Sequence, residues 1–184
     1  MHAAFSRLSS LEREEYKLLP KHFQPAAKIL ESDAGEAVDI KRVATSLGSY
    51  IGDARETAGT AASPRVICVC AAALRATEVA RAFAPVKCGV AKLFAKHFKE
   101  AEQAEYLRSS KAKVAVGTPH RLHRLCAAGA LNLKSMTLLL IDTKPDVKGA
   151  TIFDQAPLRD SLVAFYRESL HPLVKSGQVK ICFV

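Results

Sequence analysis

The sequence lacks the apolar segments that would place it in a membrane or send it through one. Every charge-free apolar run is far shorter than the roughly 20 residues that a membrane-spanning helix needs. Residues 1–15 are rich in charged side chains and poor in apolar ones, so they lack the apolar stretch of a secretory signal. We therefore expect a soluble intracellular protein with no membrane partner.

The sequence also lacks the common motifs of nucleotide-binding and hydrolytic enzymes. A phosphate-binding loop needs GxxxxGK followed by Ser or Thr, between a strand and a helix. The nearest segment, residues 48–53, has no lysine and follows a predicted helix. Neither GxGxxG nor the G-x-S-x-G nucleophile elbow is present. We predict no catalytic residue, no cofactor and no small-molecule substrate, although sequence alone leaves a dispersed Ser-His-Asp or Cys-His site open.

The five cysteines do not form a metal-binding pattern. Their number is odd and no secretory signal precedes them, which favours reduced thiols. Cys68 and Cys70 alternate in the apolar run 66–73, so they would share one face of a strand. No CxxC pair or close pair of histidines supplies further ligands. We therefore predict buried free thiols and no metal site.

Positive charge is concentrated in one part of the chain. The formal net charge is +9, and residues 61–124 contribute +8 of it, whereas residues 1–60 contribute −1 and residues 125–184 contribute +2. A basic region of this kind indicates a polyanionic partner. The alternative is that the charge serves solubility alone.

The hydrophobic pattern predicts an α/β fold. The 184 residues suit one domain with a sizeable core. Apolar spacing predicts an amphipathic helix over residues 37–52 and helices over 97–109 and from Pro157, the last ending or kinking near Pro172. Five predicted strands alternate with helices, over residues 66–70, 90–94, 113–116, 137–141 and 179–184. Such alternation predicts a mostly parallel five-stranded sheet with helices on both faces.

We predict a domain boundary near residue 60, where the hydrophobic pattern of the sequence changes. Residues 9–12 contain a helix start with a capping box, and residues 59–64 form a loop of small residues. We predict an N-terminal helical extension over residues 1–60, laid on the sheet or on its edge. The α/β domain would then span residues 61–184.

The sharpest local feature is the segment 117–122, which follows a predicted strand. Thr118 suits the N-cap of a helix and Pro119 its first turn, and free amide groups there favour an anion such as phosphate. Arg121 and Arg124 lie one turn apart and can flank that anion, while His120 and His123 add two donors. A plain capped helix with exposed basic residues is an equal alternative.

Basic residues also stand at two other junctions between a strand and a helix. Arg75 follows the strand 66–70 and should emerge at the same edge of the sheet as the segment 117–122. Lys92, Lys96 and Lys99 interleave with apolar residues at the end of the strand 90–94. The alternative for these lysines is simple solvation.

Asp142 stands at the tip of a buried strand, where nucleotide hydrolases hold a metal ion. Their chemistry needs a neighbouring carboxylate to orient water, but the next residues are Thr143 and Lys144, and a cation would oppose a metal ion. We interpret this as a degenerate motif, with Asp142 acting as a strand-end cap.

Three segments resemble, in chain order, motifs of the first RecA-like lobe of DEAD-box RNA helicases. Residues 73–76 stand where that family has Pro-Thr-Arg-Glu, and residues 117–122 match its Gly-Thr-Pro-Gly-Arg-Leu except at His120. Residues 141–145 stand where it has Leu-Asp-Glu-Ala-Asp, of which Asp142 remains. The resemblance implies a RecA-like fold that keeps the two RNA-contacting motifs and has lost the residues for metal binding and water activation.

A narrower resemblance is to the Cms family, degenerate helicase-like subunits of the U3-containing small-subunit pre-ribosome. It rests on Lys-Leu-Phe-Ala-Lys-His at 92–97, Gly-Thr-Pro at 117–119 and the strand ending at Asp142, and it spans roughly residues 37–184. Members usually begin with a low-complexity acidic and basic tail, which this sequence lacks. The resemblance implies a non-catalytic protein of the nucleus and nucleolus, acting in early small-subunit ribosome biogenesis and pre-rRNA processing.

This resemblance also implies partners and a binding surface. The partners would be pre-rRNA or small nucleolar RNA, together with pre-ribosomal proteins. The residues expected to bind RNA are Arg75, Lys92, Lys96, Lys99, Gly117, Thr118, Pro119, His120, Arg121 and Arg124. Two alternatives stay open: a structural adaptor that contacts protein only, and an ATP-dependent RNA helicase lobe.

Overall fold

A single parallel sheet forms the centre of the molecule. The computed structural model describes residues 14–26, 29, 39–51, 61–95 and 98–184. Its strands, in chain order, are β1 (Val66–Val69), β2 (Val90–Leu93), β3 (Val114–Gly117), β4 (Leu138–Ile141) and β5 (Lys180–Phe183). They lie in the order β2-β3-β1-β4-β5 and every pairing is parallel. The predicted α/β fold with a five-stranded parallel sheet is confirmed.

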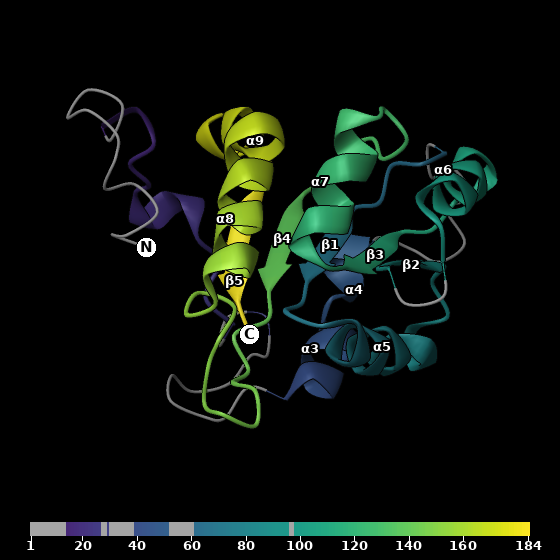
Figure 1. Ribbon diagram of the computed structural model, residues 1–184, viewed down its shortest axis with the longest axis horizontal. Coiled ribbons are helices and arrows are strands. Elements are labelled where there is room, and N and C mark those ends of the chain that lie inside the picture. The colour runs from purple at the N-terminus through teal and green to yellow at the C-terminus, as the bar shows by residue number, and fades with distance from the viewer. Residues whose placement is uncertain (1–13, 27–28, 30–38, 52–60, 96–97) are drawn as a thin grey trace.

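Helices cover both faces of the sheet (Figure 1). One face carries α3 (Ile40–Ser46), α4 (Gly48–Ile51) and α5 (Ala73–Ala82), and the 3-10 turn η3 (Ala84–Val86) follows α5. The other face carries α6 (Glu100–Ser109), α7 (Pro119–Ala127), α8 (Ala156–Phe165) and α9 (His171–Lys175). Within the described part of the chain, no helix is both long enough and apolar enough to cross a membrane.

Alternation along the strands divides the core into two clusters. Successive strand residues point to opposite faces, so Val66 and Cys68 pack with α3 and α5 while Ile67 and Val69 pack with α7 and α8. Cys68, Cys70 and Cys182 share the first cluster, and all five cysteines are free. Burial raises the pKa of the Cys68 thiol well above its usual value, because the thiolate would lose its hydration. These thiols are therefore apolar core side chains rather than nucleophiles.

Two predicted helices have different boundaries in the structure. The helix predicted over residues 37–52 is two helices, α3 and α4, because the chain leaves helical geometry at Leu47, just before Gly48. The helix predicted from residue 97 begins at Glu100, where the carboxylate of Glu102 accepts a hydrogen bond from the N–H of Lys99. That bond satisfies a backbone donor at the helix start, which places the boundary there.

The helix that follows Pro157 continues through Pro172. A π-helical turn (Tyr166–Leu170) separates α8 from α9, and α9 carries Pro172 in its first turn and ends at Lys175. Proline has no N–H and cannot complete the regular helical ladder. The irregularity expected near Pro172 is therefore present as a wider turn just before it, and the helical run ends later than predicted.

Residues 20–24 lie on the edge of the sheet. After the 3-10 turn η2 (Pro20–His22), Phe23 pairs in parallel with Ile181 of β5, and the N–H of Gln24 donates to the Ile181 carbonyl at 2.8 Å. The ammonium of Lys180 donates to the carbonyl of Lys21 at 2.6 Å. The helix start predicted at residues 9–12 lies outside the described residues.

Helices α3 and α4 belong to the same core as the sheet. Val43, Ala44, Leu47 and Ile51 are buried with strand residues in the first cluster. The packing favours treating residues 39–51 as part of the α/β unit, while the boundary near residue 60 stays a prediction.

Candidate nucleic-acid interface

Parallel strands bring the predicted motifs to one edge of the sheet. The register aligns Leu93 with Gly117 and Val69 with both Gly117 and Ile141, so the carboxyl ends of the strands β2, β3, β1 and β4 lie side by side. Arg75 follows β1 and Asp142 follows β4 at this edge. Ligands of open α/β sheets bind at such an edge, so this edge is the candidate binding site.

Gly117 is required by the packing of the strand ends. A Cβ atom at this position would lie 2.4 Å from the carbonyl oxygen of Leu93 and 2.9 Å from Cγ of Leu122. The carbonyl of Gly117 accepts a hydrogen bond from the N–H of Cys70 at 2.9 Å. Gly117 therefore lets β3 lie close to β2 and to the start of α7, which is a structural role.

Helix α7 begins as the sequence predicts. Thr118 is the N-cap in extended geometry, its carbonyl accepts from the N–H of Leu122 at 3.0 Å, and Pro119 is the first helical residue. The Thr118 hydroxyl makes no capping hydrogen bond. The first amides of a helix have no partner within it, so this end of α7 presents N–H groups and a partial positive charge at the carboxyl edge.

Arg121 is held by the neighbouring helix. One of its terminal nitrogens, Nη1, donates to Oε1 of Gln103 at 2.6 Å and to the carbonyl of Phe98 at 3.1 Å. Gln103 is buried, and its amide donates to the carbonyls of Lys92 and Phe94 at the end of β2. Gln103 is not among the predicted site residues, although it lies four residues before buried Leu107 and so on the inward stripe of α6.

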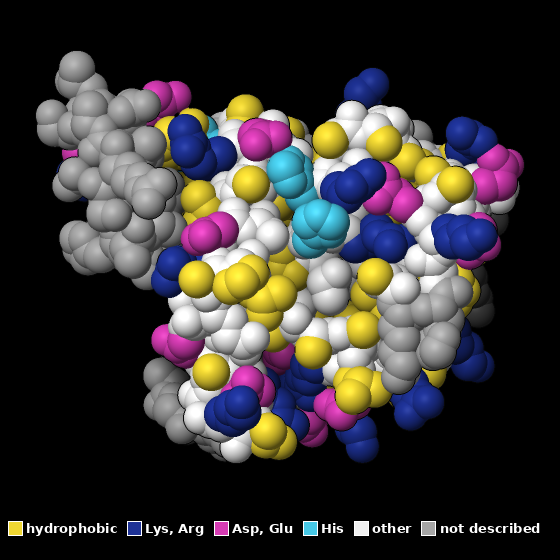
Figure 2. All heavy atoms as spheres, viewed as in Figure 1, with side chains coloured by type: hydrophobic (Ala, Val, Ile, Leu, Met, Phe, Trp, Pro, Cys, Tyr) yellow, Lys and Arg dark blue, Asp and Glu magenta, His cyan; other side chains and the backbone are white. Residues whose placement is uncertain are grey.

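The other polar side chains of α7 differ in their contacts. Nε of Arg124 lies 2.7 Å from a carboxylate oxygen of Glu100, and Nε2 of His123 lies 2.8 Å from one of Glu168. His120 is exposed and makes no hydrogen bond or ion pair with the described residues. Figure 2 shows histidine, lysine and arginine side chains gathered over α7, with carboxylates beside them. The surface is basic but partly neutralised within the protein.

The predicted lysines do not all join this surface. Ala91 and Leu93 face α7, so alternation places the exposed side chain of Lys92 on the opposite face of the sheet. Lys99 is exposed at the start of α6. The residue before it, Phe98, accepts a hydrogen bond from Arg121, so Lys99 lies close to the α7 surface. Lys96 lies outside the described residues.

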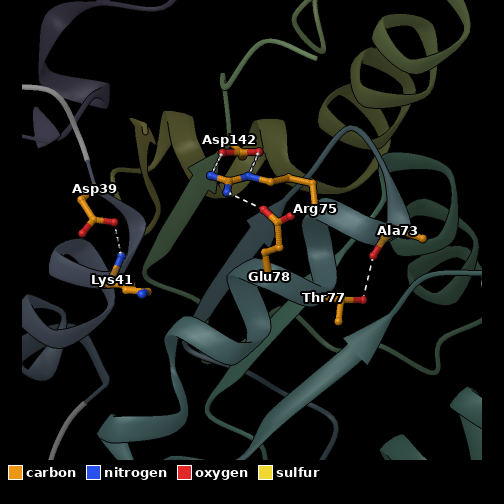
Figure 3. Close-up of polar contacts among 7 residues, drawn as sticks. All are labelled: Asp39, Lys41, Ala73, Arg75, Thr77, Glu78 and Asp142. Atoms are coloured by element: carbon orange, nitrogen blue, oxygen red, sulfur yellow. Dashed lines mark hydrogen bonds and ion pairs between the residues drawn. The ribbon is translucent and has the colours of Figure 1, made fainter. Parts of the chain in front are cut away.

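Arg75 and Asp142 form an ion pair across the edge of the sheet. Nε of Arg75 donates to Oδ2 of Asp142 at 2.9 Å and Nη2 donates to Oδ1 at 2.8 Å, while Nη1 donates to Glu78 at 3.1 Å (Figure 3). Asp142 is 3% exposed, and its hydrogen bonds raise the pKa of Arg75 above its usual value. The interpretation of Asp142 as a strand-end cap is wrong, because both carboxylate oxygens accept from a side chain.

The two residues after Asp142 add no further carboxylate at this edge of the sheet. The N–H and the hydroxyl of Thr143 donate to the carbonyl of Val184, at 2.7 and 3.0 Å, and Lys144 is exposed. Among the described residues, no three His, Cys, Asp or Glu side chains are grouped so that they could hold a metal ion. The Arg75–Asp142 and Thr143–Val184 contacts therefore link the carboxyl ends of β1, β4 and β5.

Comparison with known proteins identifies the family. The sequence model of "CMS1: U3-containing 90S pre-ribosomal complex subunit" matches residues 44–184. The chain belongs to this family. Protein CMS1 of Chaetomium thermophilum is 38% identical over 117 residues, which cover 61% of this chain and 42% of that protein. Protein CMSS1 of Homo sapiens is 30% identical over 119 residues, which cover 63% of this chain and 43% of that protein. The match thus spans less than half the length of these curated CMS1-family relatives.

Solved structures show that this CMS1-family chain has the RecA-like fold of DEAD-box proteins. A Saccharomyces cerevisiae Dbp5 variant bound to RNA and ADP BeF3 superposes with a TM-score of 0.58 at 14% identity, over 86% of this chain and 38% of that one. A DEAD box protein from Methanococcus jannaschii gives a TM-score of 0.50 at 19% identity, over 76% of this chain and 35% of that one. At these identities the likeness establishes the fold alone.

Proposed function

We propose that this protein is a non-catalytic RNA-binding or ribonucleoprotein-binding assembly factor of early small-subunit ribosome biogenesis and pre-rRNA processing. Its family, described as a subunit of the U3-containing 90S pre-ribosomal complex, supports that role. The proposed partners are pre-rRNA or small nucleolar RNA and pre-ribosomal proteins, and the proposed location is the nucleus and nucleolus.

The start of α7 carries the RNA-binding part of the proposal. Helical amides, Arg121 and exposed His120 lie in the first turn of α7 at the carboxyl edge of the sheet, and Arg124 follows in the last turn of this short helix. A backbone phosphate at this helix start would accept hydrogen bonds from the amides and from nitrogens that Arg121 and Arg124 do not use for Gln103 and Glu100. Gly117, Thr118 and Pro119 would act by shaping this turn.

The Arg75–Asp142 pair supports the absence of catalysis. A metal-dependent phosphoryl-transfer site needs a carboxylate that is open to the ion and a second group that orients water. Here a guanidinium occupies both oxygens of Asp142, and Thr143 and Lys144 follow it. Arg75 is thus engaged with protein, and its proposed RNA contact would have to share or replace that pair.

RNA binding by the α7 surface can be tested with fluorescence anisotropy on a labelled structured RNA, across a range of salt concentrations. Arg121→Ala and Arg124→Ala should each weaken binding and lower the salt slope by roughly one per lost phosphate contact. Arg108→Ala is a matched control, because it removes the same charge from an exposed arginine of α6 that pairs with Glu105. If all three variants weaken RNA binding equally, or if none of them changes it, the proposal is contradicted.

A second candidate function is a structural adaptor that contacts only protein. The observation that favours it is that Arg121, His123 and Arg124 already have partners within the chain. RNA–protein crosslinking in the assembled particle distinguishes the two functions. RNA crosslinks between residues 75 and 124 would support RNA binding, and their absence would favour the adaptor.

A further inference from the structure

A groove lies where α3 packs against α5, on the face of the sheet opposite α7. It has a volume of about 430 Å³ and is lined by Lys41, Thr45, Glu78, Arg81, Ala82 and Pro85. Pockets of this size accommodate a small group of side chains or a compact ligand. The α7 surface lies on the other side of the sheet, so the groove is a separate feature (Figure 1).

The groove combines an apolar floor with a cationic rim. Ala82 and Pro85 provide apolar floor surface. Lys41 stands on α3 and Arg81 on α5, and both are exposed and make no side-chain hydrogen bond or ion pair with the described residues. Asp39 accepts a hydrogen bond from the backbone N–H of Lys41 at 3.0 Å, as Figure 3 shows, and no described contact joins it to the ammonium group. The rim therefore offers two positive charges.

The acidic residue of the lining shares its cation with Asp142. Glu78 lies 3.1 Å from Nη1 of Arg75, the guanidinium that also pairs with Asp142 (Figure 3). Arg75 compensates Glu78 only in part, because its one positive charge also serves Asp142, and the three side chains together carry −1. Lys41 and Arg81 add +2, so these five side chains keep a net charge of +1.

An exposed apolar side chain lies on α5, the helix that supplies three of the groove residues. Leu74 is 66% exposed, and it lies four residues before Glu78 and seven before Arg81. Residues at this spacing fall on one face of a helix. One face of α5 thus carries the apolar Leu74, the acidic Glu78 and the cationic Arg81.

We propose that the groove between α3 and α5 docks a short acidic segment of a protein partner, with one apolar side chain inserted between the helices. Its carboxylates would pair with Lys41 and Arg81, and its apolar side chain would cover Ala82 and Pro85. The lining has no aromatic ring on which a nucleic-acid base could stack, which favours a peptide over RNA. A second copy of this chain, with its own charge of +9, has the wrong sign for a cationic rim.

The proposal can be tested by nuclear magnetic resonance titration of the full chain. The probe is a blocked ten-residue peptide of Asp and Glu with one central Leu, and a matched peptide carries Ser in place of that Leu. Amide shifts should localise to α3 and α5, and the Leu peptide should bind several-fold more tightly than the Ser peptide, because only Leu gains from burial. Shifts centred on α7, or equal affinity for both peptides, would overturn the proposal.

Three variants separate this groove from general attraction to a basic protein. Lys41→Glu and Arg81→Glu should each lower the affinity for the Leu peptide roughly tenfold, since they place like charges beside the ligand. Lys148→Glu makes the same change in net charge at an exposed loop position and should alter affinity less than twofold. If Lys148→Glu weakens binding as much as the other two, the interaction is non-specific and the proposal is wrong.

A fourth variant tests the shape of the groove without changing charge. Thr45 is exposed on α3, so Thr45→Phe should fill the groove while the core stays intact. It should abolish the difference between the Leu and Ser peptides, and circular dichroism checks that the fold is kept. RNA binding should be unaffected by all of these substitutions, and a persistent preference for Leu in Thr45→Phe would contradict the inference.

Discussion

At the scale of single residues, Asp142 shows how a residue can stay in place while its surroundings change its role. An aspartate at the tip of a buried strand suits a metal ion when its oxygens are open. In this protein Arg75, 67 residues earlier in the chain, donates to both of them. The same carboxylate therefore becomes half of a buried ion pair that ties the start of α5 to the end of β4.

Removal of one partner of this pair should be more harmful than removal of both. Arg75→Met leaves the buried Asp142 without a cation and should lower the free energy of unfolding by about 2–4 kcal/mol, since an uncompensated buried charge is costly. The double variant with Asp142→Leu should lose less than the sum of the single losses. Urea unfolding of the four proteins measures this coupling, and strictly additive losses would show that the pair contributes nothing of its own.

Two glycines provide a matched test of the close packing at the strand ends. Gly117→Ala should destabilise the protein by about 1–3 kcal/mol, because its new Cβ would meet the backbone carbonyl of Leu93. Gly48→Ala, in α4, meets nothing within 4 Å and should be neutral or stabilising, since alanine favours a helix. Thermal unfolding compares the two, and equal tolerance at both positions would refute the structural role of Gly117.

At the scale of elements, side chains that look like ligand contacts also hold helices together. Arg121 and Gln103 join α7 to α6 and to the end of β2, and Arg124 with Glu100 adds a second link between the two helices. On the other side of α7, His123 reaches Glu168 in the π-helical turn. RNA binding at α7 would therefore act on a surface whose geometry α6 and the π-helical turn already support.

Two buried histidines should make the docking of residues 14–26 sensitive to pH. His22 accepts a hydrogen bond from the N–H of Leu19 through Nδ1, and His171 contacts the rings of Tyr16 and Tyr166. Burial lowers the pKa of both imidazoles below the usual 6.5, and nearby lysines lower it further. Because the unfolded chain then binds more protons, this stability is fully present above about pH 6.5 and is lost as the pH falls below it.

Urea unfolding at pH 7.5 and pH 5 measures this dependence. His22→Asn keeps a side-chain acceptor for the N–H of Leu19 but does not titrate, so it should reduce the loss of stability at pH 5. His120→Asn changes an exposed histidine and should leave the loss unchanged. If both variants behave like the unmodified protein, the titrating groups lie elsewhere.

At the scale of the whole molecule, the fold divides the basic segment 61–124 between two faces of the sheet. Residues 61–124 carry a net charge of +8, but Arg121 and Arg124 lie with α7 while Lys92 and Arg81 lie on the side of α5. A molecule with two separated cationic surfaces can contact two partners at once. This arrangement suits an assembly factor that joins RNA to a neighbouring protein, as the two proposals together require.

We predict that this chain does not respond to nucleotide. A ligand that binds only the native state stabilises it by about 2.7 kcal/mol when present at 100 times its dissociation constant. With Asp142 paired to Arg75, ATP with Mg²⁺ at millimolar concentration should leave the thermal midpoint unchanged. Differential scanning fluorimetry and a hydrolysis assay with RNA check this. A clear shift, or turnover that Asp142→Ala abolishes, would show that the protein is an active NTPase.

Local periodicity and turn chemistry were enough to predict the five strands, their alternation with helices and the start of α7 at Thr118 and Pro119. Helix boundaries at Leu47 and Glu100 were missed, since they depend on one or two backbone contacts. Three findings required the folded chain: Arg75 pairs with Asp142, Gln103 holds Arg121, and Lys92 faces away from α7. Those facts join residues distant in sequence or depend on strand register, so no local pattern contains them.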